Sequence, residues 1–362
     1  MNEFDPAKAH AGLAIEHGRQ LTRARFSPCG KFVAAGGLDR AVHLWELESK
    51  AHTAFAGHAS WIGALAFHPD KRRLFSADYH GAIRAWDYTA PDAPPLFTIA
   101  AAHPDAIRAL AVTPDGALLL SAGDDAIERA WSTTDGKLAR EFPGHDGPVF
   151  SLATHPGDGS FVTGDLRGAV RQWRADGTLA RTLDAKLLHT RKEDFIADVG
   201  GVRSLAFNAD GSRLAVGGLR DMESNTFCPG TPAVLVFDWN TGQAAPPLRM
   251  AQKADGPING LRWLRDGTLV GACEHLNAPT QMSFWQPDKA PEPFHSFVGE
   301  SAYDLDLHPD GLRLVAPHFV SKGSGGNGAR DPHREKYIAN AARIRVVNLW
   351  AAPSARAVEH SK

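Results

Sequence analysis

One stretch of the sequence carries a histidine, a serine and an aspartate, the residue types of a hydrolytic triad. His103, Ser121 and Asp125 all fall within residues 102–142. In such a triad the histidine takes the proton of the serine nucleophile and the aspartate orients the histidine, beside an oxyanion hole and a cleft. Parts of the same set recur along the chain, whereas a catalytic site occurs once. We therefore interpret these side chains as structural groups that tie a loop to two strands, and we predict no catalytic residue.

The stretch that carries them has the pattern of a small antiparallel sheet. Its four short β-type runs span residues 107–112, 118–122, 127–131 and 137–142. Turn residues separate these runs, which is typical of an antiparallel meander. A single sheet of this size cannot bury both of its faces, so it needs neighbouring units of the same kind.

The sequence supplies those neighbours by repeating itself. Four aromatic residues at the end of the third run recur at about 41 to 45 residues, the period of a four-stranded blade: Trp45, Trp86, Trp131 and Trp173. Three longer units carry the same mark at Phe237, Trp285 and Trp350. Seven units therefore account for nearly the whole chain.

The marks of these units resemble those of the WD-repeat β-propeller family. Gly-His pairs stand before the first run at 57–58 and 144–145, and a Trp-Asp pair ends the third run at 86–87. His17 and His103 take the histidine place without the glycine. The resemblance implies an all-β fold, a seven-bladed β-propeller of four-stranded antiparallel blades. It also implies that residues 9–16 form the fourth strand of the last blade and close the ring, which removes exposed sheet edges.

The resemblance further implies a hydrogen-bond network within each blade. Unit three has the full set, which is His103, Ser121, Asp125 and Trp131. Unit one has Ala35 in place of the hydroxyl, although His17, Asp39 and Trp45 are present. Units two and four keep the hydroxyl at Ser76 and Thr163, but His80 and Arg167 stand where the aspartate is expected.

The composition is that of an ordinary soluble globular protein. Hydrophobic residues make up 43% of the 362 residues, charged residues 22%, and the formal net charge is −2. The balanced charge argues against nucleic acid and against an anionic membrane as partners, and no apolar run approaches the ~20 residues of a membrane span. Three cysteines do not make a disulfide framework, and the first residues lack an apolar signal core. We predict a cytoplasmic protein with a single domain over residues 1–362, a short tail at 351–362 and no cofactor.

The second half of the chain carries four insertions, at residues 184–201, 219–232, 273–280 and 319–342. The first joins two units, and the other three join second to third strands. In an up-and-down blade both kinds of connection emerge on one face, the top face in the family's naming. Insertions on one face of a repeat fold often mark its binding face, although drift in loop length is also tolerated cheaply. Helical spacing within 188–199 predicts a short helix, and Asp331 before Pro332 predicts the start of another.

The rim of the expected channel offers a second candidate surface. Comparable positions in the family often contact partners, and Arg, Trp and Tyr dominate protein interfaces energetically. Two arginines would suit a carboxylate or phosphate of the partner. The predicted partner-binding residues on the top face are Trp61, Arg108, Phe150, Arg203, Asn259, Tyr303, Arg191, His275 and His318.

These observations predict a non-enzymatic scaffold that binds a peptide or protein partner on the top face, chiefly over blades five to seven. The alternative is an enzyme or a propeller that binds a small ligand or metal, with a channel-mouth pocket roofed by the insertions. Cys273 and His318 fall at matching places in units six and seven, but pairings such as Cys-x-x-Cys are absent, so no metal is predicted. A subunit of a larger complex is a third hypothesis.

Overall fold

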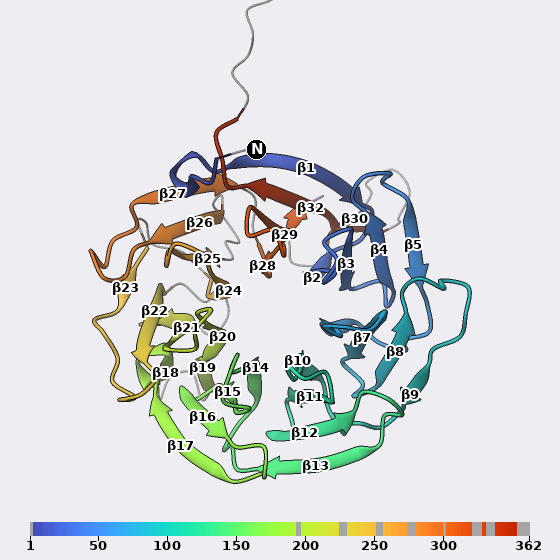
Figure 1. The fold of residues 1–362 in the computed structure, drawn as a ribbon, viewed down its shortest axis with the longest axis horizontal. Coiled ribbons are helices and arrows are strands. Elements are labelled where there is room, and N and C mark those ends of the chain that lie inside the picture. The colour runs from blue at the N-terminus through green and yellow to red at the C-terminus, as the bar shows by residue number, and fades with distance from the viewer. Residues whose placement is uncertain are drawn as a thin grey trace, which may run out of the picture.

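In the computed structural model of the protein, seven β-sheets form a ring (Figure 1), and the first strands of the ring line a central channel. The structure describes residues 3–192, 197–223, 230–250, 256–273, 280–299, 302–320, 328–330 and 337–352. Each sheet is a four-stranded antiparallel blade, and the first strand of each blade lies nearest the channel (Figure 1). The predicted fold class, a seven-bladed β-propeller, is confirmed.

Blades 1 to 4 follow one another without long interruptions. Blade 1 has β2 (Leu21–Phe26), β3 (Phe32–Gly37), β4 (Val42–Glu46) and β5 (His52–Phe55). Blade 2 has β6 (Ile62–Phe67), β7 (Arg73–Asp78), β8 (Ile83–Asp87) and β9 (Phe97–Ile99). Blade 3 has β10 (Ile107–Val112), β11 (Leu118–Gly123), β12 (Ile127–Ser132) and β13 (Leu138–Pro143). Blade 4 has β14 (Val149–Thr154), β15 (Phe161–Asp165), β16 (Ala169–Trp173) and β17 (Leu179–Asp184).

Blades 5 to 7 hold the longer units. Blade 5 has β20 (Val202–Phe207), β21 (Arg213–Arg220), β22 (Thr231–Asp238) and β23 (Leu248–Arg249). Blade 6 has β24 (Ile258–Trp263), β25 (Leu269–Cys273), β26 (Thr280–Trp285) and β27 (His295–Gly299). Blade 7 has β28 (Asp306–Leu307), β29 (Arg313–Val320), β32 (Ala341–Asn348) and, as its outer strand, β1 (His10–His17). A 3₁₀ turn, η1 (Pro6–Lys8), precedes β1.

The ring is closed by β1, the first strand of the chain, which pairs with the last blade. It pairs antiparallel with β32, from His10 opposite Asn348 to His17 opposite Ala342. Leu13 and Ile15 of β1 pack against a buried cluster shared by blades 7 and 1. The seam is therefore both hydrogen-bonded and buried, and the edge of β32 is covered.

The hydrophobic core lies between the blades. Seven clusters of buried side chains fill the seven junctions between neighbouring blades. The aromatic residues that mark the repeat are buried in these clusters, among them Trp86, Trp131 and Trp285. Removing such a side chain costs about 3–5 kcal/mol in typical cores, so the repeat mark in the sequence is a packing requirement.

The link between blades 4 and 5 forms a hairpin, so the helix predicted there is wrong. After a 3₁₀ turn, η2 (Lys186–Leu188), β18 (His189–Lys192) pairs with β19 (Ala197–Gly200). Leu188 is buried in the cluster between blades 4 and 5. β-Branched Thr190 lies opposite Val199, a pair that favours a strand. The apolar spacing in the sequence therefore reflects one docked turn and a hairpin.

The insertion of blade 7 also contains a short hairpin. β30 (Gly328–Arg330) pairs with β31 (Tyr337–Ala339). The second helix predicted from the sequence begins at 331–336, outside the described residues, but it does not extend through β31. This hairpin joins the second strand of a blade to the third, and β18–β19 joins a fourth strand to a first. Both connections leave the blades at the same face, which we call the top face.

The helical elements of the described residues, η1 and η2, are three-residue turns. No helix in these parts of the chain is long and apolar enough to cross a bilayer.

Candidate functional site

The triad-like residues of blade 3 form a buried network. Nδ1 of His103 lies 2.9 Å from Asp125, and Nε2 of His103 lies 2.7 Å from Oγ of Ser121. The indole N–H of Trp131 donates to the same Oγ at 2.9 Å. Ser121 is fully buried and its hydroxyl is engaged on both sides, so it has no access to a substrate. The geometry ties the loop before β10 to β11 and β12.

Blades 2 and 4 hold the same network, although the sequence did not reveal the aspartate. His58 lies 2.8 Å from Asp78, and His145 lies 2.7 Å from Asp165. These carboxylates stand at the ends of β7 and β15, two residues before His80 and Arg167, where the sequence pattern placed them. The expectation that these blades lack the aspartate is wrong, because a carboxylate at the strand end reaches the histidine as well as one in the turn. The signal available in the sequence was the aspartate that ends the second strand of each of these two blades, Asp78 and Asp165.

The central channel has a volume of about 530 Å³ and is lined by the first strands of the blades. Most of its charged side chains gather where blades 6, 7 and 1 meet. Arg25 pairs with Asp304, and Nη2 of Arg262 lies 2.9 Å from Oδ1 of Asp306. Asp306 also accepts the backbone N–H of Phe26 at 2.9 Å. These aspartates therefore satisfy the open edge of β2 and help to join the closing blade to the first.

An arginine–aromatic cluster lies on the top rim of the channel over blades 2 and 3. Arg108 makes a two-point salt bridge with Asp124, at 2.8 and 2.6 Å, and its guanidinium lies 4.4 Å from the ring centroid of Tyr79. Trp61 stands 5.8 Å from Tyr79, ring to ring, and is 45% exposed. We call these residues the first rim cluster. Tyr79 and Asp124 were not among the predicted site residues, since their role depends on contacts between blades.

A second cluster lies over blades 4 and 5. The guanidinium of Arg203 lies 3.8 Å from the centroid of Phe150, and its Nε donates to the carbonyl of Gly200 at 2.8 Å. We call Phe150 and Arg203 the second rim cluster. Of the other predicted rim residues, Asn259 lines the channel and Tyr303 contacts Phe319 edge to face.

The remaining predicted site residues lie in or near the insertions. Arg191, on β18, is largely exposed and lies 3.1 Å from Asp198 of β19, which also pairs with His189 at 2.9 Å. His318 of β29 is only 1% exposed, so its ring is not presented at the surface. His275 lies outside the described residues.

The insertions show no assembled metal site among the described residues. The thiol of Cys273 is buried and donates to the carbonyl of Gly256 at 3.1 Å, while His189 pairs with Asp198. One group in the described part of the chain does have the make-up of a metal site, namely His17, Asp39 and His43 of the blade 1 region. The sequence analysis did not single out His43, although it stands two residues before Trp45, where units two to four have arginine.

Comparison with known families agrees with this architecture. The family model described as "WD domain, G-beta repeat" matches residues 13–46, 49–87, 94–127 and 136–174. Four matched repeats together with seven four-stranded blades confirm the resemblance to the WD-repeat β-propeller family.

Curated relatives match short parts of the chain. A U3 snoRNP-associated protein-like EMB2271 of Arabidopsis thaliana is 35% identical over 72 residues, which are 20% of this chain and 15% of that protein. The nuclear distribution protein nudF of Emericella nidulans is 34% identical over 84 residues, 23% of this chain and 19% of the relative. A nuclear distribution protein PAC1 of Arthroderma benhamiae is 38% identical over 61 residues, 17% and 13%. The chain therefore matches less than a fifth of the length of these relatives.

Proposed function

We propose that this propeller is a non-enzymatic scaffold that binds a peptide or protein partner on its top face. The observation that carries the proposal is the pair of rim clusters, Arg108 with Tyr79 and Trp61, and Arg203 with Phe150. Arginine and aromatic side chains are the usual anchors of protein interfaces. Relatives named as snoRNP-associated and nuclear distribution proteins also fit a chain that works with partners.

The rim clusters favour a partner with both an apolar and an acidic group. Trp61 offers an exposed indole face. Arg108 is held by Asp124 and Tyr79, and Arg203 by Phe150 and the carbonyl of Gly200. Little side-chain freedom is therefore lost when an acidic group binds their remaining guanidinium N–H groups. Arg191 on β18, between blades 4 and 5, extends the same face.

The partner surface was predicted chiefly over blades five to seven, and the insertions there stay part of the proposal. The described anchors lie over blades 2 to 5. We therefore propose a contact that begins on the rim clusters and continues over the insertions. A cytoplasmic location and membership in a larger complex stay predictions.

The test compares capture by the intact chain with capture by the double variant Trp61→Ala/Arg203→Ala. Leu138→Ala is the matched control, because Leu138 is a 50% exposed apolar residue on the outer strand β13. Circular dichroism and thermal melts establish that all three fold. We expect the wild type and Leu138→Ala to capture one common partner from source lysate, and the double variant to lose it.

Equal capture by all three proteins would contradict the rim-cluster proposal and would place the interface elsewhere. If no protein is captured and a small ligand binds in the channel instead, that result would favour the alternative function. The arginines and aspartates of the channel are the groups that such a ligand would meet.

A further inference from the structure

Blade 1 departs from its neighbours in the side chains that surround the network histidine. In blades 2 to 4 a serine or threonine hydroxyl bonds Nε2 of the histidine, and Nδ1 faces the aspartate. Blade 1 has Ala35 at the hydroxyl position. Its His43 occupies the place that arginine takes in the other three, where Arg129 of blade 3 reaches Asp125 at 2.6 Å. One change therefore removes a hydroxyl, and the other replaces a guanidinium with an imidazole.

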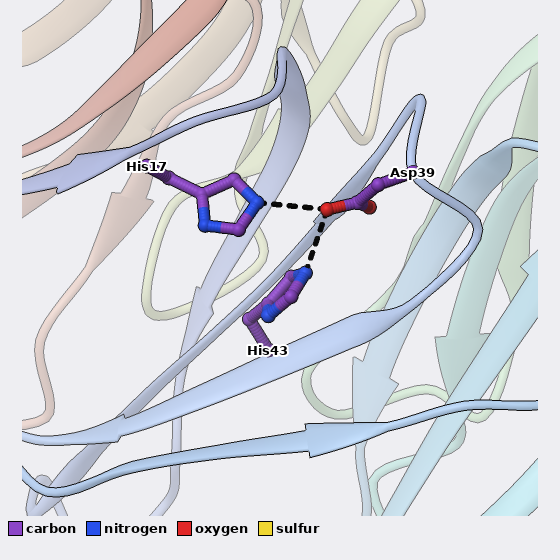
Figure 2. A group of neighbouring side chains, drawn as sticks. All are labelled: His17, Asp39 and His43. Atoms are coloured by element: carbon purple, nitrogen blue, oxygen red, sulfur yellow. Dashed lines mark hydrogen bonds and ion pairs between the residues drawn. The ribbon is translucent and has the colours of Figure 1, made fainter.

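These changes bring two imidazoles to one carboxylate oxygen (Figure 2). Oδ2 of Asp39 lies 2.7 Å from Nε2 of His17 and 2.8 Å from Nε2 of His43. The ligand atoms of the three residues all lie within 4.8 Å of one another. One carboxylate oxygen therefore faces two ring nitrogens from two different strands.

A second shell orients one of the imidazoles. Nδ1 of His43 lies 2.9 Å from Nε2 of His52, and His52 stacks on Trp45 with ring centroids 4.9 Å apart. Histidines that bind metals usually have a hydrogen-bond partner on their other ring nitrogen, most often a carboxylate, a backbone carbonyl or water. His52 would take that place for His43 by accepting from its Nδ1.

We propose that His17, Asp39 and His43 bind a divalent transition metal, with Zn²⁺ as the ion of choice. Two imidazoles and one carboxylate are a known zinc ligand set, with bonds of about 2.0–2.2 Å. Ligand atoms around such an ion lie about 3.3 Å apart, so each N–O distance must open by about 0.5 Å, which small side-chain rotations allow. The three side chains are 8% to 17% exposed, so all three are in contact with solvent.

The position of the site indicates what the metal does. His17 is the last residue of β1, the strand that completes blade 7, whereas Asp39 and His43 belong to blade 1. A bound ion therefore links the two blades across the seam at which the ring closes. Because a ligand of the folded state stabilises it by mass action, the metal acts as a clamp on ring closure.

The test uses the full chain, stripped with a chelator and titrated with ZnCl₂. Calorimetry and native mass spectrometry measure binding, thermal melts measure stability, and Co²⁺ in place of Zn²⁺ reports the ligand geometry through its visible absorption. His43→Arg is the main variant, since arginine occupies this place in blades 2 to 4 and is compatible with the fold. His17→Gln is the second variant. Asp125→Asn, at the corresponding site of blade 3, is the matched control.

We expect the wild type and Asp125→Asn to bind one more Zn²⁺ than either histidine variant. The dissociation constant for Zn²⁺ at this site should be at least about 100-fold lower in the wild type and in Asp125→Asn than in the two histidine variants. The rise in melting temperature caused by zinc should disappear in both histidine variants. Zinc binding and a thermal shift that persist unchanged in His43→Arg and His17→Gln would overturn the proposal, as would a wild type that binds no zinc. Either result leaves the scaffold function untouched, because the rim clusters do not include these residues.

Discussion

Oε1 of Glu128 in blade 3 lies 3.3 Å from Nε2 of His145 in blade 4, and both side chains are buried. Glu128 stands three residues before Trp131, where blades 2 and 4 have Ile83 and Val170. A carboxyl group therefore replaces an apolar side chain in the junction between the blades. Burial raises the pKa of this carboxyl from 4.5 to about 8.

The raised pKa of Glu128 predicts a stability that depends on pH. The folded state holds the Glu128 proton longer than the unfolded chain does, so stability falls as the pH rises from about 4.5 to about 8. Glu128→Gln removes this titration, and its free energy of unfolding should exceed that of the wild type by about 2–4 kcal/mol above pH 8. The difference should shrink towards pH 4.5. Urea unfolding followed by tryptophan fluorescence at several pH values measures it.

The control for that experiment is Glu48→Gln, because Glu48 is exposed in a turn of blade 1. We expect its unfolding free energy to follow that of the wild type across the pH range. A Glu128→Gln difference that stays constant with pH would show that burial of this carboxyl does not control its protonation.

The network of blade 3 should be sensitive to loss of its hydroxyl. Ser121→Ala removes the acceptor of the Trp131 indole N–H and the partner of His103, and buried polar groups left unpaired cost about 1–3 kcal/mol each. We expect a loss of about 2–4 kcal/mol in unfolding free energy, measured by urea denaturation. Ala35→Ser in blade 1 is the comparison, since it adds a hydroxyl at the same position of a blade that lacks one. A loss below 0.5 kcal/mol in Ser121→Ala, on the order of a surface substitution, would contradict a structural role for the network.

The channel aspartates should contribute more to stability than an aspartate of the outer surface. Asp306→Ala leaves Arg262 and the N–H of Phe26 without this acceptor, and we expect it to cost about 1–3 kcal/mol. Asp288→Ala removes a similar arginine partner at 2.8 Å, from a side chain that is 72% exposed, and should change stability by less than about 1 kcal/mol. Thermal and urea melts of both variants measure the two losses in stability. Equal losses would show that the channel pairs are screened like surface ones.

Gly116 lies in a turn between the first and second strands of blade 3, on the face opposite the top face. A substitution there tests how tightly neighbouring blades pack. Gly116 has φ of +72°, and a Cβ added there would lie 2.5 Å from Cε1 of His68 in the preceding blade. Gly267 has φ of +81° with open space around it, so Gly267→Ala measures backbone strain alone. Gly116→Ala should therefore cost about 1–2 kcal/mol more than Gly267→Ala in urea unfolding. Matching costs would mean that His68 moves aside freely.

The repeat pattern was enough to predict the blades, the ring and the strand that closes it. Trp45, Trp86, Trp131 and Trp173 recur because each blade must bury the same side chain against its neighbour. Because this packing requirement recurs in every blade, it produces a residue pattern that can be recognised in the sequence. Residues 9–16 could likewise be assigned to the last blade from the family resemblance, and β1 does pair with β32 there.

The sites depended on contacts that sequence spacing does not encode. Asp78 and Asp165 reach their histidines from strand ends rather than turns, and the hairpin of β18 and β19 replaced an expected helix because tertiary packing outweighs local periodicity. Arg108 lies over Tyr79, and His17 of β1 meets Asp39 and His43 across the ring seam. Each of these relationships joins different strands or blades, so only the closed ring brings the side chains together.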